Sequence, residues 1–422
     1  MDTDRRCGRL SEHEAAVLEP YGTPVYAFFE PKVRRNYRRL REALDEHYAD
    51  SVVHFAVKAN YEPGVLSVLR DEGCHAEVYG GGELSAALEA GYDPADLLVT
   101  GMNRRVDQVI RALDAGVPRF LVDNETELEG LIEAAGRASG DPPKVLIRGN
   151  PAIEVPTDPD IATATRESKF GLDVRSGRAM AVAERAVDAP AVELAGVQLH
   201  LGSQITDPEP YAVAAREMCR FAATVRDAHD VDIEVLDLGG GFPVPYDSDV
   251  PPVERFVARI GATVREACDE YGLRPPTLFL EPGRRLIGDA GALFATVGVV
   301  KETPYATFAV LDAGTNAISS HWPYPVHSIP HDEPTERYHV AGPLCYSGDV
   351  IAEDVPLPPL DPGDVLAIDR IGAYSLGSAS HTNGTPKPPV VLVRMDGTVD
   401  VIRDRETEAD VLRNSRIPED LL

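Results

Sequence analysis

Short apolar segments recur at fairly even spacing through the first two thirds of the chain. Most are rich in β-branched or aromatic residues, and segments with the helical repeat of apolar positions lie between them. Strands that alternate with helices predict βαβ units and a parallel sheet. Eight such strands in about 230 residues predict a closed (β/α)8 TIM barrel. The strands are expected at residues 52–57, 75–79, 97–100, 119–123, 144–149, 194–200, 233–238 and 277–281.

An open doubly wound sheet is the alternative architecture, but no GxGxxG motif follows the first strand. After about residue 295 the pattern changes to strands with few helices between them, which predicts a β-rich domain of the sandwich or barrel-like kind. Asp396-Gly397 lies between two apolar runs and predicts a hairpin turn. We therefore expect a barrel at residues 30–294 and a β-domain made of residues 1–29 plus 295–422, with VYAFF (25–29) as a candidate strand of the β-domain.

The composition limits the partners and the compartment. The formal net charge of −28 argues against nucleic acid and anionic membranes as partners. No apolar run is long enough to span a bilayer, and the N-terminus has no secretory signal pattern. The five cysteines are widely spaced without a CxxC pair, which indicates free thiols in a reducing cytoplasm and no metal site. Scarce lysine and the acidic balance resemble proteins of salt-loaded cytoplasms, so we expect stability to depend on salt.

Polar residues stand where the predicted barrel strands end. Lys58 is one of six lysines in the chain and follows the first strand, while Arg148 and His200 end the fifth and sixth strands. Gly239-Gly240-Gly241 follows the seventh strand, and Glu281-Pro282-Gly283-Arg284 follows the eighth. Each feature alone is ordinary, because strand-end bases are usually solvated and GGG is usually a tight turn. The carboxyl ends of barrel strands meet on one rim, however, so all of these residues are expected to converge there.

This set of residues suggests a cofactor. Glycine backbone N–H groups after strand seven let an oxyanion approach closely, and Arg284 adds a charged fork for phosphate. Lys58, placed among Phe55, Val57 and the barrel mouth, is expected to be desolvated and therefore nucleophilic. A phosphate site and a nucleophilic lysine on the same rim point to pyridoxal 5'-phosphate.

Eight motifs follow one another along the chain: FAVKAN, GGGEL (80–84), ESKFGL (167–172), HLGSQ (200–204), DLGGGF (237–242), EPGRRL (281–286), GPLCYSGD (342–349) and GAY (372–374). Together and in this order they resemble the diaminopimelate/ornithine decarboxylase family, the fold-type III pyridoxal phosphate enzymes. The resemblance covers nearly the whole chain and is closest to diaminopimelate decarboxylase. It is specific for the family and much less so for the substrate.

The resemblance implies an amino acid decarboxylase, a carboxy-lyase, that acts as a homodimer with shared active sites. Lys58 would form the Schiff base with the cofactor, His200 would stack on its ring, and Glu281 would hold its ring nitrogen protonated. Cys345 would come from across the dimer interface and protonate the carbon left after CO₂ departs. Asp349 lies in the same loop as Cys345 and receives no role. The other cofactor-binding residues would be Arg148, Ser203, Gly239, Gly240, Gly241, Gly283, Arg284 and Tyr374.

The substrate pocket departs from the family pattern at two positions. The residue after the GPLC cysteine is an acid in diaminopimelate and ornithine decarboxylases, but it is Tyr346 here. The arginine that would grip the distal carboxylate aligns with Ser320, while Tyr324 keeps the family's tyrosine. Serine does not replace a bidentate arginine–carboxylate contact. The expected substrate-binding residues are Arg284, Ser320, Tyr324, Tyr346 and Tyr374.

We therefore favour a substrate whose far end is not a free amino acid group, such as a conjugated amino acid or a carboxylated polyamine. The alternative is meso-diaminopimelate, as in lysine biosynthesis. An alanine-racemase-like enzyme ranks lower, because racemases place an arginine where this chain has Glu281. A non-catalytic regulatory relative also ranks lower, because Lys58 and Cys345 are both kept. The segment at residues 150–168 is rich in turn-forming residues, so a loop that closes over the site is consistent with the sequence. The sequence does not decide whether such a closure occurs.

Overall fold

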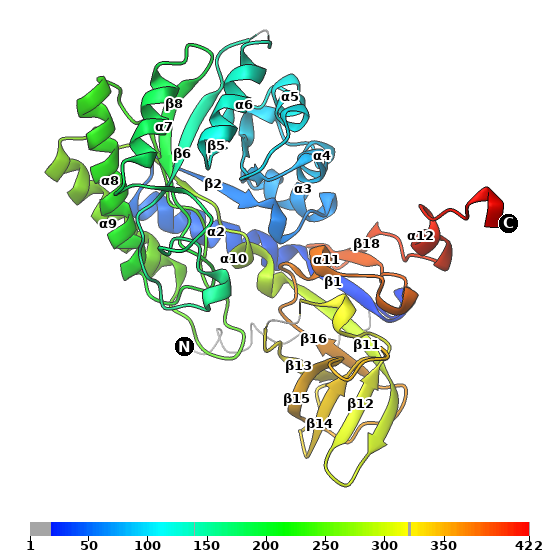
Figure 1. Ribbon diagram of the computed structural model, residues 1–422. Coiled ribbons are helices and arrows are strands. Elements are labelled where there is room, and N and C mark those ends of the chain that lie inside the picture. Colours follow the sequence, from blue (N-terminus) through cyan, green and yellow to red (C-terminus); the bar gives the residue numbers. More distant parts are fainter. Residues whose placement is uncertain (1–17, 139, 320–321, 422) are drawn as a thin grey trace. The chain divides into compact units, whose positions relative to one another are not determined.

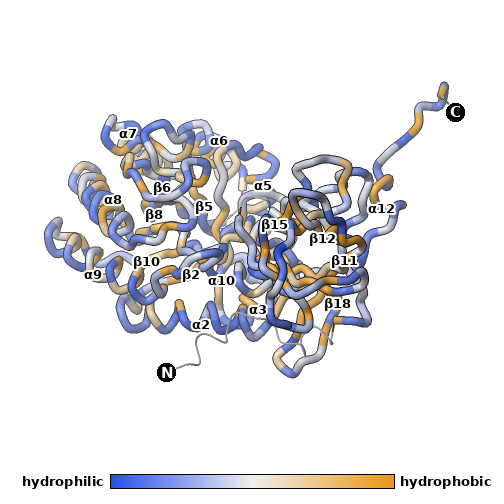
Figure 2. The backbone as a smooth tube through the Cα atoms, turned by 90° about the horizontal axis from the view of Figure 1, so that it is seen from below, coloured by the Kyte–Doolittle hydropathy of each residue, from blue (hydrophilic) through white to orange (hydrophobic). Residues whose placement is uncertain are grey.

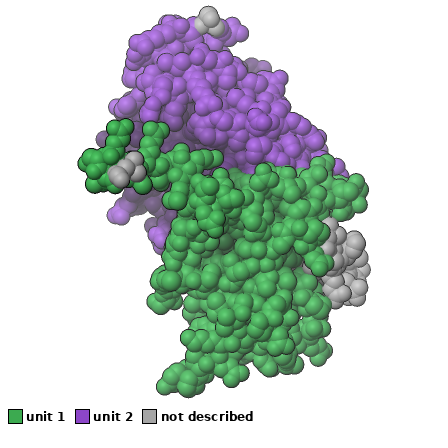
Figure 3. Space-filling model, turned by 90° about the vertical axis from the view of Figure 1, so that its right-hand side faces the viewer, with its two compact units in different colours: residues 1–33, 245–249, 287–422 green, residues 34–244, 250–286 purple. Residues whose placement is uncertain are grey.

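The computed structural model describes residues 18–138, 140–319 and 322–421. The chain forms two compact units, which Figure 3 shows in different colours. One unit comprises Arg34–Val244 and Val250–Leu286, and the other comprises Met1–Val33, Pro245–Asp249 and Ile287–Leu422. Within the described ranges, no helix is both long and apolar enough to cross a membrane.

The unit made of residues 34–244 and 250–286, purple in Figure 3, contains a closed barrel of parallel strands, as predicted (Figure 1). The strands are β2 (Ser51–Ala56), β3 (His75–Val78), β4 (Leu97–Val99), β5 (Arg119–Val122), β6 (Lys144–Asn150), β8 (Glu193–Gln198), β9 (Val235–Asp237) and β10 (Thr277–Leu280). The sheet closes because β10 pairs with β2 and β5 pairs with β6. A short additional strand, β7 (Leu172–Asp173), pairs with β6 alone. A closed ring has no unpaired edge, which removes a template for aggregation.

Helices alternate with the barrel strands along the chain and turn their apolar faces toward the sheet. They are α2 (Glu30–His47), α3 (Pro63–Asp71), α4 (Gly81–Glu89), α5 (Val106–Asp114), α6 (Glu125–Ala135), α7 (Arg178–Val187), α8 (Glu209–His229), α9 (Val253–Tyr271) and α10 (Arg284–Ile287). Hydrophobic and hydrophilic residues alternate along α8 and α9, as Figure 2 shows. In α9 the buried positions Phe256, Val257, Ile260 and Val264 repeat with the helical period. This spacing explains why the segment forms a helix that packs on a sheet.

The barrel interior is filled by side chains from different strands. Leu98, Leu121, Leu146, Val235 and Phe279 form one buried cluster. At Gly196 on β8, an added Cβ would lie 2.9 Å from Leu146 Cγ and 2.9 Å from Val235 Cβ. The absence of a side chain there lets its neighbours close the core. The interior is thus a packed support for the strand ends.

The other unit, green in Figure 3, is built on a mixed nine-stranded sheet. Its strands are β1 (Val25–Phe29), β11 (Gly291–Glu302), β12 (Thr307–Leu311), β13 (Val326–Ile329), β14 (Glu336–Ala341), β15 (Val350–Leu357), β16 (Val365–Ile368), β17 (Val390–Val393) and β18 (Val399–Arg403). Strand β1 pairs antiparallel with β11 and parallel with β17, so the candidate strand at residues 25–29 does join this sheet. Two short helices, α11 (Ser375–Ser378) and α12 (Glu408–Leu412), complete the unit.

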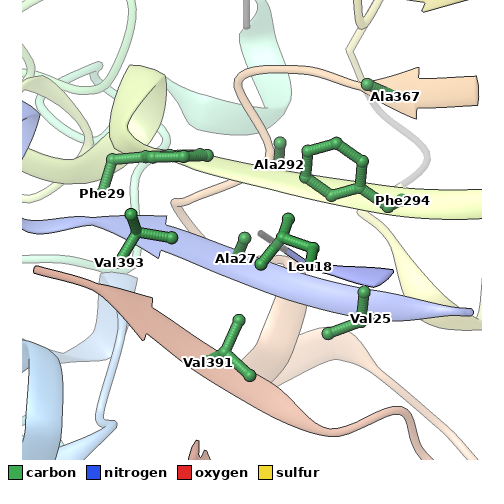
Figure 4. Close-up of a cluster of buried hydrophobic side chains, with 9 residues drawn as sticks. All are labelled: Leu18, Val25, Ala27, Phe29, Ala292, Phe294, Ala367, Val391 and Val393. Carbon is green, nitrogen blue, oxygen red and sulfur yellow. The ribbon is translucent and has the colours of Figure 1, made fainter. Parts of the chain in front are cut away.

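One face of this sheet carries a compact hydrophobic cluster (Figure 4). Alternate residues of β1 point into it, as expected for a strand with one packed face. The cluster consists of Leu18, Val25, Ala27, Phe29, Ala292, Phe294, Ala367, Val391 and Val393. Its members come from segments at both ends of the chain. Their burial therefore holds the N-terminal strand to the C-terminal sheet.

The hairpin predicted at Asp396-Gly397 joins β17 to β18. Arg394 N donates to Thr398 O at 2.8 Å, and Gly397 has a φ of 84°, a conformation that suits glycine. The division of the chain into a functional barrel domain at residues 30–294 and a β-domain made of the remaining residues stays a prediction.

Candidate active site

A cavity of about 360 Å³ opens at the carboxyl ends of the barrel strands. Four of the predicted site residues line it: Lys58, Arg148, His200 and Glu281. The other lining residues are Glu77, Tyr79, Thr100, Gly101, Met102, Thr163, Lys169, Phe170 and Gln198. Residues that are far apart in sequence thus meet at one rim, as the strand-end argument predicted.

Lys58 is partly exposed, contrary to the prediction that it is desolvated. Strand β2 ends at Ala56, and Lys58 lies in a short 3-10 helix, η2 (Val57–Ala59), with 43% of its side chain exposed. Its Nζ forms an ion pair with the buried carboxylate of Glu77, at 3.0 Å from Oε2. Glu77 lies on the neighbouring strand β3, where it pairs with Ala56, the last residue of β2. A nearby carboxylate favours the ammonium form, so Glu77 holds the Lys58 amine in place as a cation.

Glu281 follows β10 and is only 4% exposed. Gln198 Nε2 donates to Glu281 Oε2 at 3.1 Å. The other oxygen, Oε1, is buried, and no described residue satisfies it with a hydrogen bond. Burial, followed by the charges of Asp237 and Glu77, raises the pKa of Glu281 well above its ordinary value. A buried, unsatisfied carboxylate oxygen at a cavity wall fits a ligand that donates a proton to it.

Asp237 lies behind this carboxyl at the end of β9. Its ladder partners are Phe279 on β10 and Gln198 on β8, so it stands beside both strands that support Glu281. Gly239 N donates to Asp237 Oδ1 at 2.8 Å, whereas Oδ2 is buried without a described partner. Burial raises the pKa of Asp237 to about 7. Two such carboxyls cannot both ionise easily, so the pair retains a proton near neutral pH.

His200 is a neutral imidazole in this site. Burial, then the charges of Lys58 and Arg148, lowers its pKa well below the ordinary value. Gly240 N donates to His200 Nδ1 at 3.2 Å, so Nδ1 is the acceptor and Nε2 carries the proton. An added Cβ at Gly239 would lie 2.7 Å from His200 Nδ1, and Gly239 has a φ of 65°. The glycine turn therefore serves to seat the imidazole, and the N–H of Gly240 is already engaged.

Ser203 and Arg284 meet beside this turn. Arg284 Nε donates to Ser203 Oγ at 3.2 Å, although the two residues follow different strands. Arg284 is buried, and it begins α10 directly after Gly283. At Gly283 an added Cβ would lie 2.9 Å from Ala59 Cβ, so only glycine lets the chain pass this close to η2. A hydroxyl, a guanidinium and glycine backbone form a donor set suited to phosphate.

Arg148 is fixed by a carboxylate and an aromatic ring. Arg148 Nη1 lies 3.1 Å from Asp123 Oδ2, which also accepts from Gly171 N at 3.1 Å. The Arg148 guanidinium lies 4.7 Å from the centre of the Phe170 ring. The ESKFGL segment, which contains Lys169, is thereby attached to β6 at the wall of the cavity.

The preceding loop, residues 150–168, is joined to the end of β8. Thr163 Oγ1 donates to His200 O at 2.6 Å, and Thr157 Oγ1 donates to Ser203 O at 2.6 Å. Ala162 forms an isolated bridge with Gly202. This loop therefore contributes a wall of the cavity, through Thr163, in the conformation described.

The remaining predicted site residues belong to the other unit and are described within it. Cys345 is exposed on the loop between β14 and β15, and Tyr346 beside it is 55% exposed. Tyr324 is buried against the Tyr246 ring at a centroid distance of 5.6 Å. Tyr374 precedes α11 with a φ of 68°, a conformation that costs energy in a non-glycine residue. Ser320 lies outside the described residues.

Sequence reasoning missed three polar residues of the barrel site: Glu77, Gln198 and Asp237. All three are buried at the carboxyl ends of otherwise apolar strands. A polar residue at the end of a buried strand was the available signal. Their contacts with Lys58 and Glu281 depend on the register between strands, which the sequence pattern does not specify.

These residues fit pyridoxal phosphate. The buried Oε1 of Glu281 lacks a hydrogen-bond donor, which a protonated pyridine nitrogen would supply, and the neutral His200 ring suits stacking on an aromatic face. Lys58 supplies the primary amine, and the Ser203–Arg284 pair supplies donors for a phosphate. No part of this donor set conflicts with the cofactor that the sequence suggested.

Comparison with known proteins agrees with this geometry. The profile of the family described as "Pyridoxal-dependent decarboxylase, pyridoxal binding domain" matches residues 30–288. The chain belongs to this family. It is 39% identical to the diaminopimelate decarboxylase of Methanothermobacter thermautotrophicus over 96% of this chain and 94% of the relative. It is 31% identical to the Bacillus subtilis diaminopimelate decarboxylase over 94% of this chain and 92% of the relative.

Solved structures show the same architecture. Diaminopimelate decarboxylase from Methanocaldococcus jannaschii in complex with L-lysine aligns with a TM-score of 0.90 and 33% identity, over 96% of this chain and 95% of that chain. The Helicobacter pylori enzyme in complex with L-lysine gives a TM-score of 0.86 and 28% identity, over 94% of this chain and 98% of that chain. The protein is therefore a pyridoxal 5'-phosphate-dependent carboxy-lyase of the diaminopimelate/ornithine decarboxylase family. The resemblance inferred from its motifs is confirmed.

Proposed function

We propose that this decarboxylase converts meso-diaminopimelate to L-lysine and CO₂. Support comes from the relatives at 39% and 34% identity, which are diaminopimelate decarboxylases along nearly the full length of this chain. The preferred hypothesis from the sequence, a conjugated or other non-diaminopimelate substrate, receives no such support. The alternative hypothesis from the sequence, meso-diaminopimelate as the substrate, is the better supported one.

Glu281 is the observation that carries the proposed chemistry. When bound, pyridoxal phosphate supplies an aldehyde for the substrate amine and a ring that withdraws electrons from the carbon losing CO₂. Glu281 would keep a proton on the ring nitrogen through its buried, otherwise unsatisfied Oε1. A carboxylate there strengthens electron withdrawal, whereas a racemase arginine would weaken it. The acid at this position therefore favours decarboxylation over racemisation.

The other barrel residues would bind and orient. Lys58 would hold the cofactor aldehyde until the substrate amine replaces it, and Glu77 would keep the released ammonium in place. His200 would cover one face of the ring, and Arg148 would flank it from the cavity wall. The phosphate would be bound by Ser203, Gly239, Gly240, Gly241, Gly283, Arg284 and Tyr374. Because the N–H of Gly240 already binds His200, we expect Ser203 and Arg284 to make the strongest phosphate contacts.

Cys345 would deliver the proton that replaces CO₂, acting in a homodimer whose protomers complete each other's sites. An exposed thiol on a loop can transfer a proton to a neighbouring protomer, whereas the other described cysteines, Cys74, Cys219 and Cys268, are buried. The far end of the substrate would contact Arg284, Ser320, Tyr324, Tyr346 and Tyr374. Tyr346, which replaces an acid, would bind the distal group by a neutral hydroxyl instead of a charge.

Release of CO₂ from meso-diaminopimelate by the purified holoenzyme tests the proposal. L-Ornithine, L-lysine and an N-acylated diaminopimelate serve as competing substrates. We expect meso-diaminopimelate to give the highest kcat/KM and L-lysine to be the product by mass spectrometry. A higher kcat/KM for the acylated substrate would overturn the proposal and restore the conjugated-substrate hypothesis.

Lys58→Ala tests the cofactor attachment. This variant is expected to lose decarboxylation and the visible absorbance of the bound cofactor. Among the described residues, Lys169 is the only other lysine that lines the cavity. Lys169→Ala is the matched variant and is expected to keep that absorbance. Full activity in Lys58→Ala would exclude the assigned role.

A further inference from the structure

The loop that carries Cys345 is built around a buried carboxylate. Residues 342–349 join β14 (Glu336–Ala341) to β15 (Val350–Leu357), and Ala341 pairs with Val350 at the base of this hairpin. Cys345 is exposed, whereas Asp349, four residues later, is only 4% exposed. No ion pair with a described residue compensates this carboxylate. A charge buried in this way requires hydrogen bonds.

Three donors meet the Asp349 carboxylate. Thr315 contributes both its N–H, at 2.7 Å, and its hydroxyl, at 2.9 Å, to Oδ1. Leu344, the residue before Cys345, donates its N–H to Oδ2 at 2.7 Å. Both oxygens are therefore used, one toward the segment after β12 (Thr307–Leu311) and the other toward the backbone adjoining the thiol. Short contacts to a charged acceptor are among the stronger hydrogen bonds of a protein.

Two glycines make room for this carboxylate. An added Cβ at Gly314 would lie 2.6 Å from Asp349 Oδ1, and one at Gly342 would collide with Asp349 Oδ2 and with Gly314 Cα. The two backbones approach each other this closely only because neither residue has a side chain. The space, the donors and the acid therefore fit one another as a set.

Backbone bonds fold the loop tightly around the same residue. Gly342 N donates to Asp349 O at 3.0 Å, and Asp349 N donates to Tyr346 O at 3.2 Å. Tyr346 N in turn donates to Leu344 O at 2.8 Å, across Cys345. The backbone on both sides of Cys345 is thus tied to a network whose centre is Asp349.

We propose that Asp349 is a positioning residue that fixes the Cys345 thiol for proton delivery. The proposal rests on the role of Cys345 in the proposed function and adds a residue to which no role is assigned there. A proton donor must approach the accepting carbon within hydrogen-bond reach and from one side. An exposed loop meets this requirement only if its backbone is held, and a displacement of about 1 Å can cost about 100-fold in rate.

Asp349→Asn tests the proposal with little change in shape. The amide oxygen can still accept from Thr315, but the amide nitrogen faces the N–H of Leu344, so the bond next to Cys345 is lost. We expect kcat for meso-diaminopimelate to fall about 10- to 100-fold with KM within about 2-fold of wild type. Asp354→Asn is the matched control, because Asp354 is an exposed acid on the same hairpin, paired with Arg337. It is expected to keep the wild-type kcat.

Labelling in deuterium oxide separates positioning from general damage. Wild type is expected to place one deuterium in a single configuration on the carbon that lost CO₂. Asp349→Asn is expected to give a mixture of configurations, because a displaced thiol lets solvent deliver the proton from either side. A variant with wild-type kcat and a single configuration would overturn the proposal.

Alkylation of Cys345 by iodoacetamide needs no substrate. It therefore tests, independently of activity, whether Asp349 holds the loop that carries Cys345. With the holoenzyme and peptide mass spectrometry, we expect Asp349→Asn to raise the rate at Cys345 at least about 3-fold, because the freed loop opens more often. Thr315→Val, which removes only the hydroxyl donor, is expected to give a smaller rise and replaces Asp349→Asn if that variant does not fold. Rates equal to that of Asp354→Asn would overturn the role of Asp349. Failure of wild type to decarboxylate diaminopimelate would overturn the proposed substrate, and the alkylation result would then decide the role of Asp349.

Discussion

The two units each bury a carboxylate to the same extent but satisfy it in opposite ways. Asp349 and Glu281 are both 4% exposed. Asp349 accepts three hydrogen bonds from its own unit, whereas Glu281 accepts one from Gln198 and keeps Oε1 unsatisfied. A fully satisfied carboxylate holds a backbone in place. A partly satisfied one remains available to a ligand and makes the ligand-free fold less stable. The comparison therefore distinguishes a residue that supports a site from one that acts in it.

Of the variants at these two carboxylates, Glu281→Gln is expected to lower the rate of decarboxylation the most. The amide is neutral and cannot stabilise a protonated ring nitrogen, so we expect kcat to fall about 100- to 1000-fold. The free energy of unfolding of the cofactor-free protein should stay nearly equal, because the raised pKa of Glu281 already leaves this buried group uncharged near neutral pH. Steady-state kinetics and urea unfolding measure the two effects. Glu234→Gln, at an exposed acid paired with Lys144, is the control for the substitution itself. A large loss of stability in Glu281→Gln would show that the carboxylate is structural.

The barrel and most of its site residues are predictable because they follow from local patterns. Eight buried strands repeat along the chain, and Lys58, His200 and Glu281 follow three of them, so topology alone brings them together. The pairing of Lys58 with Glu77 is not predictable in this way. It depends on which residue of β3 lies beside the end of β2, and therefore on strand register. The expectation of a desolvated lysine was wrong because β2 ends at Ala56 and Lys58 lies beyond it, with 43% of its side chain exposed.

The environment of Asp349 was hidden from the sequence for a different reason. Its principal donor, Thr315, lies 34 residues earlier, in the segment between β12 and β13. The spacing of GPLCYSGD indicates a loop but not the direction of its acid. A tertiary contact between two irregular segments has no periodicity, and only coordinates reveal it.

Asp237→Asn is expected to change how the free energy of unfolding depends on pH. Asp237 has a pKa raised to about 7 by burial, so the folded state keeps a proton that the unfolded state loses near its ordinary value of 3.8. Wild type therefore loses stability as pH rises from about 4 to about 7, and the variant should not. We expect Asp237→Asn to be about 1–3 kcal/mol more stable than wild type at pH 8 and nearly equal at pH 4. Urea unfolding of the cofactor-free proteins at both pH values measures this. An equal difference at both would contradict the assigned protonation.

His54→Phe extends the comparison to a buried titratable group that has neither hydrogen-bond partners nor a place in the cavity. Both ring nitrogens of His54 lack a described partner, and its ring packs at 4.6 Å from Phe279 and 5.3 Å from His75, between ring centres. Burial, then the charges of His75 and Arg119, lowers the pKa of His54 well below 6.5. The unfolded state therefore binds a proton below pH 6.5 that the folded state refuses, and wild type loses stability as pH falls through that value. At pH 5 this loss is about 1–2 kcal/mol relative to pH 8, and His54→Phe should remove it. Urea unfolding at the two pH values tests the prediction, with His54→Leu as a second apolar variant. If both variants keep the wild-type pH dependence, His54 does not titrate on unfolding, and burial without partners has no cost at this position.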